Sequence, residues 1–165
     1  MKYPLDRICV KSGILCPSCQ RKVETGVVDI DEVKVMKALM DIEEKHKVLR
    51  NGEYVKSFMA GDQLILIIRD GVEQGELEEV SKHLARELDA KVRVIVETGD
   101  MRRLIEQVIS PASLLGVNQV WLPDGTEIVN VRVPRRDRRY LEKNRSIAEE
   151  LIAKLTGKRA RITFE

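Results

Sequence analysis

An internal repeat is the feature that most restricts how this chain can fold. The order helix, strand, strand, helix, strand is predicted twice, and the two copies align by eye. QLILIIR at 63–69 aligns with TEIVNVR at 126–132, an offset of 63 residues, and LDAKVRVIV at 88–96 aligns with LTGKRARIT at 155–163, an offset of 67. The second copy therefore has four extra residues between its central strand and the following helix. Two small α+β units of one topology are predicted.

The second copy shows the clearest periodicities. A strand is predicted at 127–133, where three alternating valines share one face. A helix is predicted at 145–156, because Ala148, Leu151, Ile152 and Leu155 recur at helical spacing. Gly157 suits a left-handed helix end, and a last strand is predicted at 158–164.

The other elements follow from the same two periodicities. Helices are predicted at about 31–49, at 75–88 and from Asp100 to just before Pro111, and strands at 54–58, 63–69, 91–96 and 116–122. Residues 123–125, Pro-Asp-Gly, are a strong turn signal between two strands. Trp121 is the single tryptophan of a largely aliphatic protein, so we expect it in a core or an interface.

Length and composition suit one domain or two small ones, since the chain has 165 residues, of which 43% are apolar. We predict an N-terminal segment at 1–30, a first domain at 31–98 and a second at 99–165. The sequence has no apolar run near the roughly 20 residues of a membrane span, and its first residues lack the apolar region of a signal peptide. We expect a cytoplasmic protein with no membrane partner.

A basic segment between the strand at 127–133 and the helix at 145–156 is the predicted binding site. From Arg132 to Arg145 seven basic residues stand against Asp137 and Glu142, which gives +5 in fourteen residues, whereas the whole chain carries +2. Arginine suits bidentate contact with phosphate, so this segment favours a nucleic acid. The alternative is a solvated charged face that pairs with acidic residues elsewhere.

Three cysteines lie in the N-terminal segment, at Cys9, Cys16 and Cys19. The CxxC of 16–19 permits three interpretations: a zinc site with Cys9 as third ligand, a redox dithiol, or a tight turn with small thiols and no further role. A fourth zinc ligand would have to be the distant His46 or His83. A redox motif needs a following helix, for which Thr25 and Gly26 are a poor context.

We find no sequence support for an enzyme. Neither histidine has a serine or a carboxylate clustered with it, and the chain has no phosphate-cradling glycine loop and no HExxH motif. A protein without catalytic residues is predicted.

Three short stretches resemble a known family. They are Val108-Ile109-Ser110-Pro111-Ala112, Val131-Arg132-Val133-Pro134 and Leu155-Thr156-Gly157-Lys158. With the repeated element order, they make residues 31–165 similar to the tandem type II KH domains of the NusA transcription elongation and termination factors, above all to the short archaeal form. The resemblance implies an α+β fold of two KH domains and an RNA-binding factor of transcription.

The KH loop between two helices is a GxxG in that family, and the matching tetrad here is Glu142-Lys143-Asn144-Arg145, which lacks both glycines. Asn144 tolerates a left-handed conformation and could partly replace a glycine. In the first copy the matching stretch, 71–75, is too short for two helices and a loop.

Two functions follow. In the first, the protein binds RNA through Arg132, Arg135, Arg136, Arg138, Arg139, Lys143, Asn144 and Arg145. In the second, degenerate KH units form a scaffold that binds a protein of the transcription or translation machinery, such as RNA polymerase or the ribosome.

Overall fold

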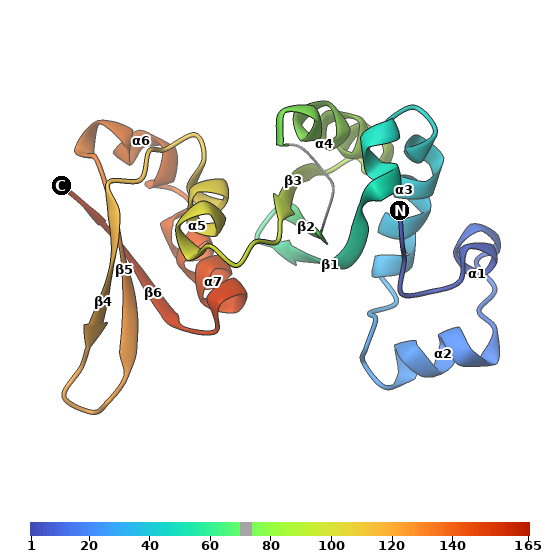
Figure 1. The fold of residues 1–165 in the computed structure, drawn as a ribbon, viewed down its shortest axis with the longest axis horizontal. Helices are drawn as coiled ribbons and strands as arrows, with labels where there is room; N and C mark the ends of the chain where they lie inside the picture. Colours follow the sequence, from blue (N-terminus) through green and yellow to red (C-terminus); the bar gives the residue numbers. More distant parts are fainter. Residues whose placement is uncertain (70–73) are drawn as a thin grey trace. The chain divides into compact units, whose positions relative to one another are not determined.

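Each predicted copy builds one three-stranded sheet with helices against it (Figure 1). The computed structural model describes residues 1–69 and 74–165, and they divide into a first unit, Met1–Glu97, and a second unit, Thr98–Glu165. The first unit contains α1 (Arg7–Ser12), α2 (Pro17–Glu24), α3 (Glu32–Glu43), the 3-10 helix η1 (Lys47–Asn51), β1 (Glu53–Ala60), β2 (Gln63–Arg69), α4 (Gln74–Leu88) and β3 (Lys91–Val96). The second contains α5 (Met101–Ile109), β4 (Gly116–Trp121), β5 (Glu127–Val133), the 3-10 helix η2 (Arg135–Asp137), α6 (Arg138–Leu141), α7 (Arg145–Thr156) and β6 (Arg159–Phe164).

The two sheets have the same topology. Their strand orders are β1-β2-β3 and β4-β5-β6, and in each the first pair is antiparallel and the second pair is parallel. The segments aligned in the sequence, β2 and β5, are the central strands of their sheets. The predicted equivalence of these two strands is therefore confirmed, as is the order helix, strand, strand, helix, strand in both units.

Apolar side chains hold each sheet to its helices. In the first unit Leu64, Leu66 and Ile68 of β2 join one core with α3 and α4. The two residues between them, Ile65 and Ile67, are also buried, which fits the continuous apolar run of β2. In the second unit the three alternating valines of β5 are fully buried, together with Ile105 of α5, Ile152 of α7 and Ile162 of β6.

The helix predicted at 31–49 is shorter than expected. It ends at Glu43, and a separate 3-10 helix, η1, follows at Lys47–Asn51. Between them His46 leaves the helical conformation, with φ −119° and ψ 86°, and its Nε2 lies 3.1 Å from Nδ1 of His83 in α4. The apolar periodicity of the sequence does not predict this contact between the two histidines.

The predicted N-terminal segment, residues 1–30, contains two short helices. They are α1 and α2, and Cys9, Val10, Cys19 and Val28 enter the core of the first unit. Lys2 also pairs with Glu53 at the start of β1, through a parallel bridge. The segment is thus packed into the first unit.

Trp121 is not a core residue, because 66% of it is exposed, and its expected place in an interface stays a prediction. It is the last residue of β4, an edge strand whose outer half is exposed on both faces. Figure 1 shows the β4–β5 hairpin extending past α5 and α7, so no helix is available there to cover an aromatic ring.

The first-copy stretch 71–75, predicted to be too short for two helices, lies mostly outside the described residues. In the described part of the chain, none of the helices is long and apolar enough to cross a membrane.

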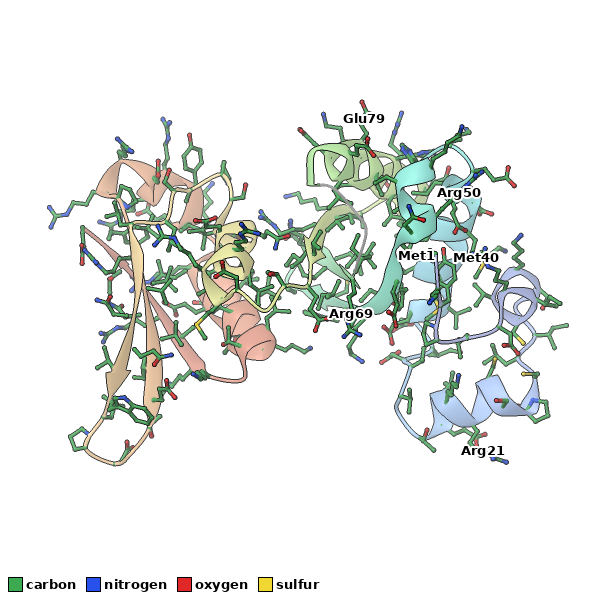
Figure 2. The ribbon with its side chains drawn as sticks, in the orientation of Figure 1. Met1, Arg21, Met40, Arg50, Arg69 and Glu79 are labelled. Carbon is green, nitrogen blue, oxygen red and sulfur yellow. The ribbon has the colours of Figure 1, made fainter. Side chains whose placement is uncertain are left out.

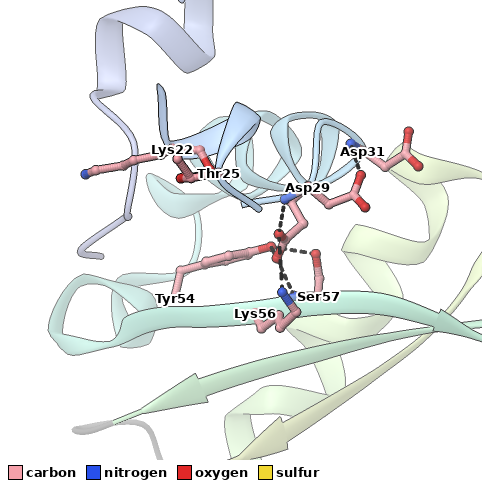
Figure 3. A network of polar contacts seen from close by, with 8 residues as sticks. Lys22, Thr25, Asp29, Asp31, Tyr54, Lys56 and Ser57 are labelled. Carbon is pink, nitrogen blue, oxygen red and sulfur yellow. Dashed lines mark hydrogen bonds and ion pairs between the residues drawn. The ribbon is translucent and has the colours of Figure 1, made fainter. Parts of the chain in front are cut away.

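A buried carboxylate joins α3 to β1. Glu32 is only 3% exposed, and its Oε1 accepts hydrogen bonds from the Tyr54 hydroxyl and the Ser57 backbone N–H, both at 2.9 Å. Its Oε2 accepts the backbone N–H of Asp29 at 2.7 Å. Figure 3 shows Tyr54, Lys56 and Ser57 of β1 converging on this group. One side chain therefore satisfies donors from two elements.

Replacing Glu32 by alanine leaves these donors unpaired in the protein interior. We expect Glu32→Ala to lower the free energy of unfolding of the first unit by about 3 kcal/mol, the range for losing bonds to a charged acceptor. Urea denaturation followed by circular dichroism measures this. Asp41→Ala, on the exposed side of the same helix, is the control, with an expected change within about 0.5 kcal/mol. Equal stability of the two variants would show that the carboxylate does not hold α3 in place.

Candidate nucleic-acid interface and metal-binding cluster

The basic segment forms the crossover that leaves β5. Pro134 follows the strand, η2 and α6 come next, and residues 142–144 form a turn before α7 begins at Arg145. The tetrad 142–145 thus lies between two helices, as its alignment with the KH loop predicts. Asn144 does not take the left-handed conformation, since its φ is −116° and it precedes α7 directly. The idea that Asn144 replaces a loop glycine is therefore wrong for this backbone.

The carboxylate of Asp137 does not contribute to the surface charge of the segment. It is buried, and its Oδ2 accepts the backbone N–H of Ser113 at 2.9 Å. This bond ties η2 to the connection between α5 and β4. Because this acid points inward, the exposed face of the segment is more basic than its composition indicates.

Three of the predicted residues gather around one hollow. Arg135, Arg138 and Arg145 line a cavity of about 540 Å³ together with Thr163 and Phe164 at the end of β6. The guanidinium carbons of Arg138 and Arg145 each lie 5.7 Å from the centre of the Phe164 ring. The cavity therefore combines positive charge with an aromatic surface. Sequence reasoning missed Thr163 and Phe164.

Arg132 already forms an ion pair with an acidic residue. Its guanidinium donates three hydrogen bonds of 2.9–3.1 Å to the carboxylate of Glu165, which lowers the pKa of Glu165. Arg139 lies over the ring of Tyr140 and donates to its hydroxyl at 2.8 Å. Arg138 has only a loose pair with Glu142, at 3.9 Å. The other three residues, Arg136, Lys143 and Asn144, are exposed.

Arg145 has a structural contact as well as a place in the cavity. Its Nη2 donates to the backbone carbonyl of Ile162 at 2.6 Å, and its Nε pairs with Glu149 at 3.2 Å. Oε1 of Glu149 also accepts the Ile162 N–H at 2.9 Å. The two side chains together fix the start of α7 to β6, so Arg145 is not free to act as a binding residue alone.

The three cysteines come together with one acid. One ligand atom from each of Asp6, Cys9, Cys16 and Cys19 lies within 4.8 Å of all the others, and such a group can hold a metal ion. Figure 2 shows sulfur atoms gathered between α1 and α2. The fourth member is Asp6. His46 and His83, which sequence reasoning offered as a fourth ligand, are not in the group; they contact each other elsewhere in the first unit.

The CxxC begins a helix, which corrects the expectation of a poor helical context. Cys16 is the N-cap of α2, Pro17 is its first residue, and the Cys16 sulfur accepts the Cys19 backbone N–H. This N–H lowers the pKa of the Cys16 thiol, whereas burial raises the pKa of the Cys19 thiol to about 11.

Comparisons with known proteins show a similar fold. A solved structure described as "Crystal structure of APE1850" has a TM-score of 0.53 and 16% sequence identity, over 79% of this chain and 96% of the other. At this identity the likeness concerns the fold alone. No family model matches the sequence, and no curated protein matches it.

Glu149 gives a test of the structural role of its pair. We expect Glu149→Ala to lower the free energy of unfolding of the second unit by about 2 kcal/mol, because the Ile162 N–H and the Nε of Arg145 both lose the carboxylate that accepts from them. Glu150→Ala, its exposed neighbour on α7, should change it by less than about 0.5 kcal/mol. Chemical denaturation of both variants is the measurement. If Glu150→Ala costs as much as Glu149→Ala, the pair with Ile162 does not secure β6.

Proposed function

We propose that this protein binds single-stranded RNA through the second unit, as a NusA-like factor of transcription elongation or termination built from two KH-type units. The observation that carries the proposal is the cavity in which Arg135, Arg138 and Arg145 surround Phe164. Phosphates and bases are the two parts of a nucleotide, and this cavity offers a partner for each. The proposal includes no catalytic residue and places the protein in the cytoplasm.

The topology supports a KH interpretation. Each unit has the order helix, strand, strand, helix, strand with a parallel final pair, and in the second unit α6, a turn and α7 stand where that family has two helices and a loop. A KH domain holds about four nucleotides beside such a loop. Here the loop tetrad lacks glycine, so we assign phosphate contact to the arginines and not to backbone amides.

Charge supports contact with phosphate. Arg135 and Arg138 are exposed at the cavity, and the ion pair between Arg138 and Glu142 is loose, at 3.9 Å. Arg136 and Lys143 are exposed on the same crossover and extend the positive surface. Because Asp137 is buried and bonded to Ser113, it opposes an approaching phosphate less than an exposed acid would.

Phe164 supports contact with a base. A base that stacks on an aromatic ring gains about 1–3 kcal/mol in single-strand recognition, whatever its identity. Arginine planes also stack on bases. A ring flanked by two guanidinium groups therefore suits an unpaired base more than a duplex, whose bases are already stacked on each other.

The alternative is a scaffold that binds a protein such as RNA polymerase or the ribosome. The missing loop glycines favour it, as does Glu142, whose carboxylate opposes phosphate. Large apolar side chains are also exposed in the first unit, at Ile8, Ile14, Val27 and Ile30. RNA binding separates the two candidates.

The double variant Arg135→Ala, Arg138→Ala tests whether these arginines bind phosphate. Removing one arginine–phosphate ion pair should reduce the slope of log affinity against log salt by about 0.7, so the double variant should flatten it by up to about 1.4 and bind more weakly at low salt. Fluorescence anisotropy with a labelled single-stranded RNA of mixed sequence measures both quantities. These two arginines are chosen because neither bonds to the backbone of β6, as Arg145 does.

The control removes the same charge elsewhere in the second unit. Arg102→Ala, Arg103→Ala changes two exposed arginines of α5, and we expect it to keep the wild-type slope. If both double variants bind RNA equally weakly, only net charge matters and the cavity is not the binding site. If the wild-type protein does not bind RNA at low salt, the scaffold becomes the better interpretation.

Phe164 gives an independent test with a different signature. Phe164→Ala should weaken RNA binding by about tenfold, near 1.4 kcal/mol, because one stacked base no longer has its partner. The salt slope should stay unchanged, since no charge is removed. Phe164→Tyr keeps a ring and should bind almost as wild type. An unchanged affinity of the alanine variant, with folding checked by circular dichroism, would exclude stacking on this ring.

A further inference from the structure

The N-terminal segment presents two matching pairs of ligand-bearing residues. Asp6 is the N-cap of α1, with Cys9 at the third helical position, and Cys16 is the N-cap of α2, with Cys19 at the third helical position. The sequence shows the same spacing in both, D-x-x-C and C-x-x-C. Two helix starts therefore bring one pair each to a common point, where all four ligand atoms lie within 4.8 Å of one another.

The backbone around this point is arranged for thiolates. Each of the three sulfurs accepts a backbone N–H from another member of the group: Cys9 from Cys16 at 3.3 Å, Cys16 from Cys19 at 3.5 Å and Cys19 from Asp6 at 3.3 Å. A neutral thiol is a weak acceptor, whereas a thiolate accepts strongly. Three amides aimed at three sulfurs are what a set of metal-bound thiolates needs, because such bonds orient the ligands.

The carboxylate of Asp6 is free for a further bond. An N-cap aspartate normally accepts the N–H of the second or third helical residue, but the Asp6 side chain makes no such bond. Its Oδ2 instead lies 3.6 Å from the Cys16 sulfur. The acid thus faces the cysteines and not its own helix.

We propose that Asp6, Cys9, Cys16 and Cys19 are the four ligands of a structural zinc ion. Four ligands complete a tetrahedron, which leaves no open position for catalysis. With Zn–S bonds of about 2.3 Å, tetrahedral sulfurs stand about 3.8 Å apart, so the observed group has only to contract slightly around the ion. Thiolates select zinc over magnesium or calcium, which take oxygen ligands.

A zinc ion would also stabilise two helices that are too short to be stable alone. α1 has six residues and α2 has eight, and helices so short are not stable by themselves. Within the segment they share only a few buried side chains, and large apolar ones, Ile8 and Ile14, are exposed. An ion that joins the starts of both helices fixes their relation where the apolar core is too small to do so.

The arrangement favours zinc over a redox dithiol. A dithiol needs Cys16 and Cys19 alone, and it gains nothing from a third sulfur and a carboxylate at the same point. All three cysteines are free thiols in the structure, and pairing any two would leave the third beside a disulfide.

Metal content of the full chain, purified under reducing conditions without chelator, is the first test. We expect one zinc per chain by elemental analysis, and removal by a strong chelator should reduce the helical signal and lower the apparent Tm. Cobalt, added to the chelator-treated protein, should give the intense visible bands of a tetrahedral site and thiolate charge-transfer bands. Less than half a zinc per chain with no cobalt spectrum would overturn the proposal, and so would a reversible Cys16–Cys19 disulfide in protein that binds no metal.

Asp6→Asn tests the fourth ligand without removing a cysteine. Loss of a residue that only hydrogen-bonds to a metal ligand typically weakens metal affinity by about 10- to 100-fold. Because Asp6 is proposed as a ligand itself, Asp6→Asn should weaken zinc binding in a chelator competition by at least that much, and it should alter the cobalt spectrum. Asp31→Asn, an exposed acid outside the group, should change neither. Cys9→Ser should abolish tight zinc binding. If this variant does not fold, the zinc content of the wild-type protein still tests the proposal. Unchanged zinc affinity in Asp6→Asn would remove Asp6 from the ligand set.

Discussion

The parallel pairing of β5 with β6 is the constraint on which the candidate interface depends. Two parallel neighbours cannot be joined by a hairpin, so the chain must leave β5, cross the sheet and return to its starting end. In the register of this pair Val133 lies opposite Phe164 and Arg132 opposite Thr163. Both strands thus end at the same edge, and the segment that leaves β5 begins beside the end of β6. Arginines from one segment and an aromatic ring from another meet there for this reason.

The first unit has the same parallel pairing with a different crossover. β2 and β3 are parallel in the same way, with Ile68 opposite Val96. Their crossover is four residues shorter, and in the residues described it has one helix, α4, where the second unit has η2, α6 and α7. With the offset of 67 residues, the position equivalent to Phe164 is Glu97, a carboxylate and not an aromatic ring. The two units therefore share a topology but carry different side chains at this end of the sheet.

The sequence predicts the elements well where burial is periodic. The bounds of β2, β3 and α7 agree with the structure to the residue, because apolar side chains on a sheet or helix face repeat at the spacing of that element. Trp121 is exposed and not in the core, because it lies at the end of the edge strand β4. The predicted length of α3 was wrong, because the helix ends at Glu43 and a separate 3-10 helix follows at Lys47–Asn51. Sequence reasoning missed two of the residues in the proposed sites, Phe164 and Asp6. Their places become visible only when segments far apart in the sequence come together. Phe164 reads as the last apolar residue of a strand until the register with β5 places it beside the arginines. Asp6 reads as a helix cap, although the repeated spacing D-x-x-C and C-x-x-C was a signal that two short helices convert into one group of four ligands.

The two proposed sites draw on different physical forces, and each is complete within its own unit. The proposed binding at the arginine cavity rests on charge and stacking, so salt should weaken it. The cysteine group requires deprotonated sulfur, so acid releases its metal, while moderate salt screens bonds of about 2.3 Å very little. The proposed ligands all belong to Met1–Glu97 and the cavity residues all belong to Thr98–Glu165, so a variant in one set leaves every residue of the other set unchanged. Weaker RNA binding after zinc removal would therefore show that the two units act on one RNA or one partner, a coupling that neither unit provides alone.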